Sequence, residues 1–309
     1  MIREEQALQF ICSDDRETWV MIGMALKSEY GEAAKDIWMD WSRQSDSFKE
    51  ADARAVWRSF RGTGVSISSL YHAAKQGGWR DSGLQRPTRE QIEERKRQSA
   101  ERSTLDAIER TVLAKKASEK AQWIIKNCKQ EQHAYLDKKG FKEVNGLVWR
   151  PKQENNLLCI PMYVGSNLRG CQLINISGEK KFLSGQVTSM AEHCFSASGR
   201  GASDWWVEGY ASGLSLMTIL NVLKLPYRIH VCFSAGNLQK MAHSGYVIAD
   251  CDASDTGRQA ARATGLPYWM PDEEGTDIND FHKAHGTFKT SQEIRRWLKQ
   301  IKDEKEYYS

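Results

Sequence analysis

The chain has 309 residues, of which 40% are hydrophobic and 27% charged, with a formal net charge of +4. This length is enough for two or three domains with a substantial core. No apolar run approaches the roughly 18 residues of a membrane span, and residues 1–6 are acidic where a signal peptide is basic and then apolar. We therefore expect a cytoplasmic protein with no membrane partner. The mild positive charge permits a nucleic-acid partner without arguing for one.

The cysteines indicate neither a metal ribbon nor a disulfide framework. No two are spaced as Cys-x-x-Cys. The seven positions are Cys12, Cys128, Cys159, Cys171, Cys194, Cys232 and Cys251. We expect no zinc, and most of these thiols are predicted to be small buried side chains in a reducing compartment.

Residues 1–80 predict a small all-helical domain. Apolar residues recur at helical spacing in several segments, the second of which follows the cap-like residues 13–15. The apolar positions are Ala7, Leu8 and Ile11; residues 19–26; Ala34, Ile37, Trp38 and Trp41; and Ala53, Val56, Trp57 and Phe60. Residues 62–64 break this pattern, and a last short helix is predicted over residues 66–75. The tryptophans are interpreted as core packing.

Four short motifs lie within this domain. They are Trp19-x-x-Ile22-Gly23-x-Ala25-Leu26, Trp41-Ser42, Trp57-x-Ser59-Phe60 and Ile67-x-Ser69-Leu70. With these motifs, residues 4–79 resemble the primase C-terminal type-two (PriCT-like) family, a small accessory domain that accompanies phage and plasmid primases. The resemblance implies a replication context more than a particular chemistry.

Residues 81–132 predict a charged helical connector. Pro87 and the acidic Glu90, Glu93 and Glu94 suit the first turns of a helix. A thin apolar stripe follows at Leu105, Ile108, Val112, Ala117, Ala121, Ile124 and Cys128. A long, partly exposed helix is therefore expected. Its basic residues 95–97 either contact phosphates or form a solvated face.

Residues 133–202 predict a small α+β region. A helix begins at His133 and ends at Gly140, and short strands are expected at 147–149, 157–162 and 170–174. Lys180 and Lys181 then precede Phe182 in a glycine-bounded segment. This segment is either a hairpin that contacts a nucleic-acid backbone or an ordinary exposed turn.

Residues 203–309 predict an α/β domain in which strands alternate with helices. The expected strands are 205–208, 229–234, 246–250 and 267–270, and the expected helices are 211–223, 237–242, 255–264 and 292–303. This alternation favours a mostly parallel sheet flanked by helices, with right-handed crossovers.

Carboxylates follow the strands of this domain at three places. Glu208 ends the first strand, Asp250 and Asp252 end a later one, and Asp277 and Asp280 come after a loop. Ligands of open parallel sheets bind at the carboxyl ends of the strands, so these acids predict a site for Mg²⁺, with Mn²⁺ as the alternative cation. Glu208 acts there either as a general base or as a metal ligand.

Two further residues near these acids have an expected role. Gly209 allows a sharp turn into the next helix. Arg258 begins a helix whose N-terminus favours phosphates. A metal clamp with nearby cations is what phosphoryl or nucleotidyl transfer requires.

A series of motifs runs through residues 133–286. They are Leu158-x-Ile160-Pro161, Gly170-x-Gln172, Gly178-x-Lys180-Lys181-Phe182-Leu183-x-Gly185, residues 208–215, Ala235-Gly236-Asn237-Leu238, Asp250-x-Asp252 and Gly257-Arg258-x-Ala260-Ala261. In this order they resemble the Toprim domain of phage and plasmid DNA primases and the region that precedes it.

The Toprim resemblance implies a role for each matched position. Glu208, Asp250 and Asp252 would be catalytic and would organise Mg²⁺, and Asp277 and Asp280 would complete the acidic edge. The nucleotide or DNA contacts would come from Lys180, Lys181, Gly209, Asn237 and Arg258. The implied reaction is the joining of ribonucleoside triphosphates into short RNA primers on a single-stranded DNA template.

Two departures from the primase pattern leave alternatives open. The sequence has no Cys/His zinc module for template recognition, and no Walker A motif for a fused helicase. Template choice and unwinding would then need partners such as a separate replicative helicase. The alternatives are a Toprim nuclease, and a non-catalytic replication accessory that binds DNA or docks on a helicase.

Overall fold

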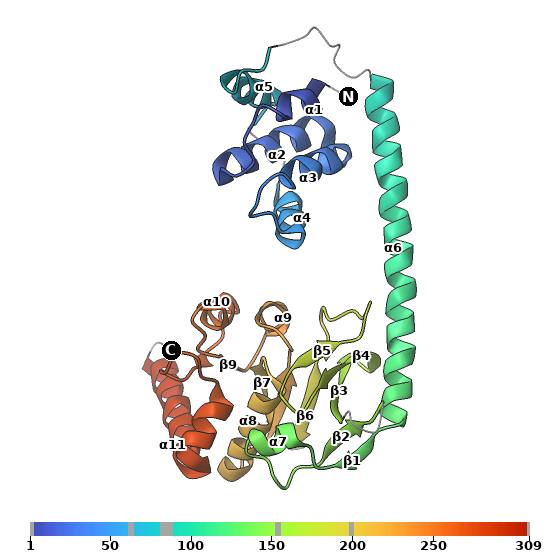
Figure 1. The fold of residues 1–309 in the computed structure, drawn as a ribbon. Helices are drawn as coiled ribbons and strands as arrows, with labels where there is room; N and C mark the ends of the chain where they lie inside the picture. The colour runs from blue at the N-terminus through green and yellow to red at the C-terminus, as the bar shows by residue number, and fades with distance from the viewer. Residues whose placement is uncertain (1–2, 61–64, 81–88, 152–155, 198–200, 308–309) are drawn as a thin grey trace. The chain divides into compact units, whose positions relative to one another are not determined.

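The computed structural model describes residues 3–60, 65–80, 89–151, 156–197 and 201–307 (Figure 1). The chain divides into two compact units, Met1–Glu109 and Arg110–Ser309. The break predicted at residues 62–64 and the helix start at Pro87 lie outside the described residues, as do the side chains of Glu90, Glu93, Arg95 and Lys96.

The first unit is helical, as predicted. Its elements are α1 (Arg3–Leu8), α2 (Arg16–Tyr30), the 3₁₀ helix η1 (Gly31–Ala34), α3 (Lys35–Ser42), α4 (Glu50–Ser59) and α5 (Ile67–Gln76). The predicted cap of α2 is confirmed, because the Asp15 carboxylate accepts a hydrogen bond from the backbone N–H of Thr18 at 2.8 Å.

Aromatic side chains fill the core of this unit. Trp38 and Trp57 are fully buried, and the Trp38 ring lies 5.5 Å from the ring of Phe60. A Cβ atom on Gly23 would come within 2.4 Å of Phe60 and 2.8 Å of the Trp38 indole nitrogen, so only glycine fits at this point of α2. The interpretation of these tryptophans as core residues is confirmed.

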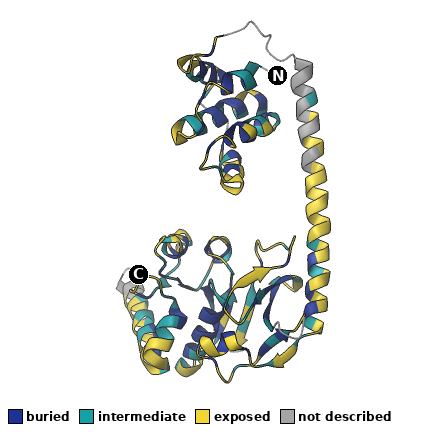
Figure 2. Ribbon diagram, in the orientation of Figure 1, coloured by how far each residue is buried: buried dark blue, intermediate teal, exposed yellow. Residues whose placement is uncertain are grey.

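Helix α6 (Arg89–Lys126) is the long helix expected in the connector. Figure 2 shows that much of its described length is exposed. Leu105 and Ile108 are 66% and 55% exposed, whereas Ala117, Ala121 and Ile124 are buried. The buried residues pack against the first sheet of the second unit.

The second unit begins with an antiparallel sheet in the order β1-β2-β3-β4-β5. The strands are β1 (Lys129–Glu131), β2 (Gly146–Trp149), β3 (Leu157–Val164), β4 (Asn167–Ile174) and β5 (Lys180–Phe182), with α7 (Ala134–Lys138) between the first two. The short, polar β1 lies where the sequence predicted the end of the connector.

The following sheet is mixed and mostly parallel, in the order β10-β9-β7-β8-β6. Its elements are β6 (His193–Ala197), β7 (Ser203–Val207), α8 (Tyr210–Leu223), β8 (Tyr227–Val231), α9 (Ala235–Met241), β9 (Tyr246–Ile248), α10 (Thr256–Ala263), β10 (Tyr268–Trp269) and α11 (Ile278–Tyr307). The predicted alternation is confirmed. The sequence missed the antiparallel edge strand β6 and the first part of α11, which is kinked at Gly286 (φ 76°).

One core joins the two sheets of the second unit. Leu158, Ile160 and Ile174 of the antiparallel sheet share a buried cluster with residues of β7, β8 and α8. The other face of the antiparallel sheet packs against α6. This arrangement fixes β5 beside the strand ends of the mixed sheet.

Candidate functional site

The carboxyl ends of β7 and β9 lie side by side. Val207 pairs with Ile248 in parallel register, so Glu208 and Asp250 follow neighbouring strands. A bridge between Cys251 and Thr276 brings the next acidic segment to the same rim. We call Glu208, Asp250 and Asp277 the acidic rim.

Asp250 is the least satisfied carboxylate of the acidic rim. Its Oδ1 is buried and has no hydrogen-bond partner among the described residues. Burial first, and then the charges of Asp277 and Glu208, raise the pKa of Asp250 to about 7, while Lys180 opposes the shift. A buried carboxylate oxygen without a donor is a place where a water or a cation can bind.

Glu208 is partly buried in the same environment. Burial raises its pKa, the nearby Asp252 adds to this, and Lys180 together with a hydrogen bond from the backbone of Ala235 lowers it. Its own carbonyl accepts the N–H of Phe233 at 2.8 Å. Glu208 is therefore held where β7, β8 and the start of α9 meet.

Asp252 is engaged differently, as a cap of α10. Its carboxylate accepts the backbone N–H groups of Thr256 at 3.1 Å and Gly257 at 2.9 Å, and the hydroxyl of Ser254. The bond from Ser254 and the backbone bonds hold the pKa of Asp252 below its usual range. A Cβ on Gly257 would lie 2.3 Å from the Asp250 carbonyl oxygen, so glycine lets α10 start against the rim.

Asp277 and Asp280 cap the start of α11 reciprocally. The Asp277 carboxylate accepts the N–H of Asp280 at 2.8 Å, and the Asp280 carboxylate accepts the N–H of Asp277 at 3.4 Å. Asp277 also accepts a bond from the Ser212 hydroxyl at 3.4 Å, whereas Asp280 pairs with Lys139 at 3.5 Å. Of the two, Asp277 is the one that acts on Asp250.

The predicted lysines lie on opposite faces of β5. Lys180 lowers the pKa of both Glu208 and Asp250, so its ammonium group faces the acidic rim. Lys181 is paired with Leu173 in register, on the α6 face of the sheet, and forms an ion pair with Glu179 at 2.9 Å. The structure thus brings only the first of the two lysines to the acids.

The other predicted contact residues have local roles in the structure. Arg258 pairs with Asp255 at 3.3 Å. Asn237 is buried, and its amide donates to two backbone carbonyls at 2.9 Å and accepts the N–H of Met190 at 2.8 Å. Gly209 precedes α8 with a φ of −101°, which other residues also adopt.

Sequence reasoning missed two side chains near the acids. Ser212 on α8 donates a hydrogen bond to Asp277. Tyr135 on α7 lies close enough for the charge of Asp277 to affect the pKa of Tyr135. Burial first, and then Asp277, raise the pKa of Tyr135 to about 12. Nothing in the local sequence around Tyr135 signals this position, because Tyr135 reaches the site through the buried core that it shares with residues of α8.

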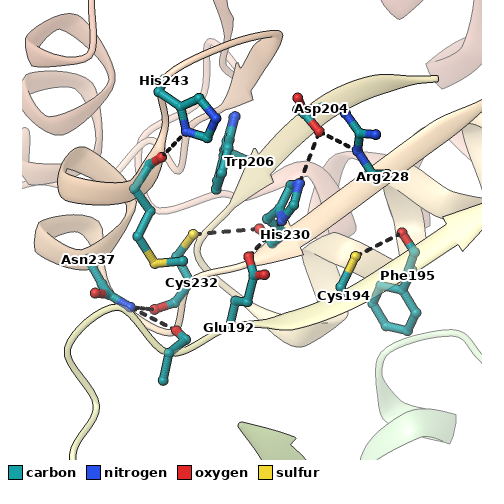
Figure 3. Close-up of polar contacts among 12 residues, drawn as sticks. Glu192, Cys194, Phe195, Asp204, Trp206, Arg228, His230, Cys232, Asn237 and His243 are labelled. Atoms are coloured by element: carbon teal, nitrogen blue, oxygen red, sulfur yellow. Dashed lines mark hydrogen bonds and ion pairs between the residues drawn. The ribbon is translucent and has the colours of Figure 1, made fainter. Parts of the chain in front are cut away.

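A second polar cluster lies on the same sheet (Figure 3). His230 bonds Glu192 at 2.6 Å and Asp204 at 3.3 Å, and Asp204 also pairs with Arg228 at 2.7 Å. The hydrogen bond from Arg228 holds the pKa of Asp204 well below its usual range. Burial lowers the pKa of His230, but its bonds to the two carboxylates raise it by more. We call these four residues the paired cluster.

The acidic rim offers a small set of oxygen ligands for a divalent cation. Within the described residues, no group of three or more His, Cys, Asp or Glu side chains is arranged to hold a metal ion. Mg²⁺ is usually bound by one or two carboxylates together with waters and substrate phosphates. Glu208 and the unpartnered oxygen of Asp250 fit that smaller requirement.

Comparisons with known proteins address the first unit. In the described part of the chain, no helix is long and apolar enough to cross a membrane. No curated protein and no solved structure matches the chain. Residues 5–74 match the family Primase C terminal 2 (PriCT-2). The expected accessory domain is thereby confirmed, and it gives the chain a primase-associated context.

Proposed function

We propose that the chain is a Toprim-type DNA primase that synthesises short RNA primers on single-stranded DNA. The observation that carries the proposal is the acidic rim, where Asp250 has a buried and unpartnered oxygen beside Glu208. The PriCT-2 domain supports a replication context. Toprim identity, the catalytic assignment and the substrates all belong to this proposal.

In the proposed reaction a 3′-hydroxyl attacks the α-phosphorus of a ribonucleoside triphosphate and pyrophosphate leaves. Glu208 and Asp250 would hold Mg²⁺ or Mn²⁺ at the rim. When bound, the cation neutralises charge on the phosphates and lowers the pKa of the attacking hydroxyl. Lys180 adds a positive charge on the same side and binds the triphosphate.

A second candidate function is a non-catalytic replication accessory that binds DNA. The observation that favours it is the engagement of Asp252, Asp277 and Asp280 in helix capping. Carboxylates that satisfy helix N-termini are less available to a cation.

A priming assay separates these functions. Purified protein is incubated with single-stranded DNA, labelled ribonucleotides and Mg²⁺, and the products are resolved by length. We expect short labelled RNA from the wild type and none from Asp250→Ala, whose fold is verified by circular dichroism.

Each other outcome has a definite meaning. Labelled products from Asp250→Ala would remove the metal assignment. Degraded template without RNA would favour a Toprim nuclease. DNA binding with neither product would favour the accessory function.

A further inference from the structure

An open groove runs between α6 and the β4 side of the antiparallel sheet. It has a volume of about 620 Å³ and is bounded by α6 residues from Arg110 to Gln122 on one side and by Arg169 and Val187 on the other. At 1.5 Å per residue, the helical wall is about 18 Å long. The groove is therefore elongated, unlike a pocket for a single phosphate.

Hydrogen bonds and close packing hold the two walls of the groove together. Ser118 of α6 donates its hydroxyl to the Leu168 carbonyl at 2.7 Å, which ties the helix to β4. Gln186 accepts the backbone N–H groups of Cys171 at 3.1 Å and Leu183 at 3.2 Å. Gly185, with a φ of 76°, lies directly against Leu113, where a Cβ would approach to 2.8 Å.

The side chains that line the groove carry a net positive charge. Arg110, Lys115 and Arg169 line it, against the single carboxylate of Glu119. Lys115 approaches Glu119 only to 4.0 Å, and the Lys115 side chain is 79% exposed. Exposed cations together with Ser and Gln side chains are the groups that contact nucleic-acid backbones.

We propose that this groove binds the backbone of a single-stranded nucleic acid. The inference rests on the proposed function, since a primase needs a template strand, and it assigns that strand to the α6 face of the sheet. Lys181, on that same face of β5, extends the positive surface. An elongated cationic groove with an exposed Val187 suits a flexible strand with splayed bases better than a rigid duplex.

The test measures binding of a fluorescein-labelled oligothymidylate without Mg²⁺, across a salt series. Lys115→Ala combined with Arg169→Ala is expected to weaken binding about tenfold. Since each single-strand phosphate contact contributes a slope of about 0.7, the loss of two contacts makes log K against log salt shallower by about 1.4. Ala114→Trp, which fills the groove without changing charge, is expected to weaken binding as well.

The matched control is Lys240→Ala combined with Lys299→Ala. It removes the same charge from exposed positions on α9 and α11 and is expected to bind like the wild type. Wild-type affinity and slope in the groove variants would overturn the proposal. The proposal would also fail if polyglutamate bound as tightly as the oligothymidylate and lost as much affinity in the groove variants. Asp250→Ala is expected to bind normally, so its loss of synthesis tests the proposed function separately.

Discussion

Two groups of carboxylates lie at opposite ends of strand β7 and differ in what surrounds them. Asp204, near the start of β7, is bonded to Arg228, His230 and Ser244. Asp250, beside the far end of β7, is half-buried and has one buried oxygen without a partner among the described residues. The pKa of Asp204 is lowered and that of Asp250 is raised. A carboxylate whose charge has no partner is a candidate metal ligand. The carboxylates of the paired cluster have partners, so their role is structural.

The largest expected effect comes from removing one carboxylate from each group in turn. Asp250→Ala should lower primer synthesis at least about 100-fold, because a metal clamp contributes several kcal/mol to transition-state stabilisation. Asp204→Ala should leave synthesis per folded molecule within about twofold. Labelled RNA product is the measurement, and equal losses in both variants would remove the distinction between the two groups.

The second effect concerns the stability contributed by the paired cluster. Asp204→Ala should lower the free energy of unfolding by about 2 kcal/mol at pH 7, because it removes the carboxylate that pairs with Arg228 and one of the two carboxylates that bond His230. Since the folded pKa of Asp204 is depressed, this contribution is present above the unfolded value of about 3.9 and fades as pH falls below it. Urea unfolding at pH 7 and pH 3 measures both points. A deficit that is the same at both pH values would contradict the ion-pair account.

The third effect is the pH dependence of stability at the acidic rim, which has the opposite sign to that of the paired cluster. The folded pKa of Asp250 is raised to about 7, so the folded metal-free protein retains a proton that the unfolded chain loses near pH 4. Stability therefore falls as pH rises from about 4 to about 7. Asp250→Asn should match the wild type near pH 4 and gain about 4 kcal/mol, or roughly 10 °C in Tm, at pH 8.

Thermal melts in the presence of a chelator test this prediction directly. The chelator prevents a bound cation from masking the repulsion at the rim. A destabilised Asp250→Asn variant at pH 8 would show that the ionised carboxylate is satisfied in solution.

The smallest effect separates the two lysines of β5. Lys180→Ala should raise the KM for ribonucleotides about tenfold, because its charge faces Glu208 and Asp250. Lys181→Ala should change that KM less than about twofold, because Lys181 is on the other face of the strand. Steady-state synthesis at varied nucleotide concentration measures this, and equal effects would contradict the assignment of faces.

The strand–helix alternation could be predicted because hydrophobic patterning decides it. Residues 205–207 and 246–249 are apolar runs just before acidic residues, and they became β7 and β9 with parallel register. Edge strand β6 could not be found in this way. Its residues alternate between partly buried and exposed, and it is held by pairing with β8 rather than by its own composition.

The sequence indicated which acids gather but not which are free. Asp252 is followed by Ser254, Thr256 and Gly257, a pattern typical of helix capping. The Asp-x-Asp spacing favours the other interpretation of Asp252, as a metal ligand. The three-residue spacing of Asp277 and Asp280 likewise signals a reciprocal cap. The burial of the Asp250 carboxylate oxygen and the face of β5 on which Lys180 lies could not be predicted from the sequence, because both depend on how the two sheets pack.

Direct cation binding tests the central assignment without any need for catalysis. Electron paramagnetic resonance measures free Mn²⁺ in titrations of the wild type, Asp250→Ala and Asp204→Ala at pH 8, where Asp250 is ionised. We predict that the wild type and Asp204→Ala bind Mn²⁺ alike and that Asp250→Ala binds it at least about 30-fold more weakly, roughly 2 kcal/mol. Undiminished binding by Asp250→Ala, or loss of binding by Asp204→Ala, would contradict the account.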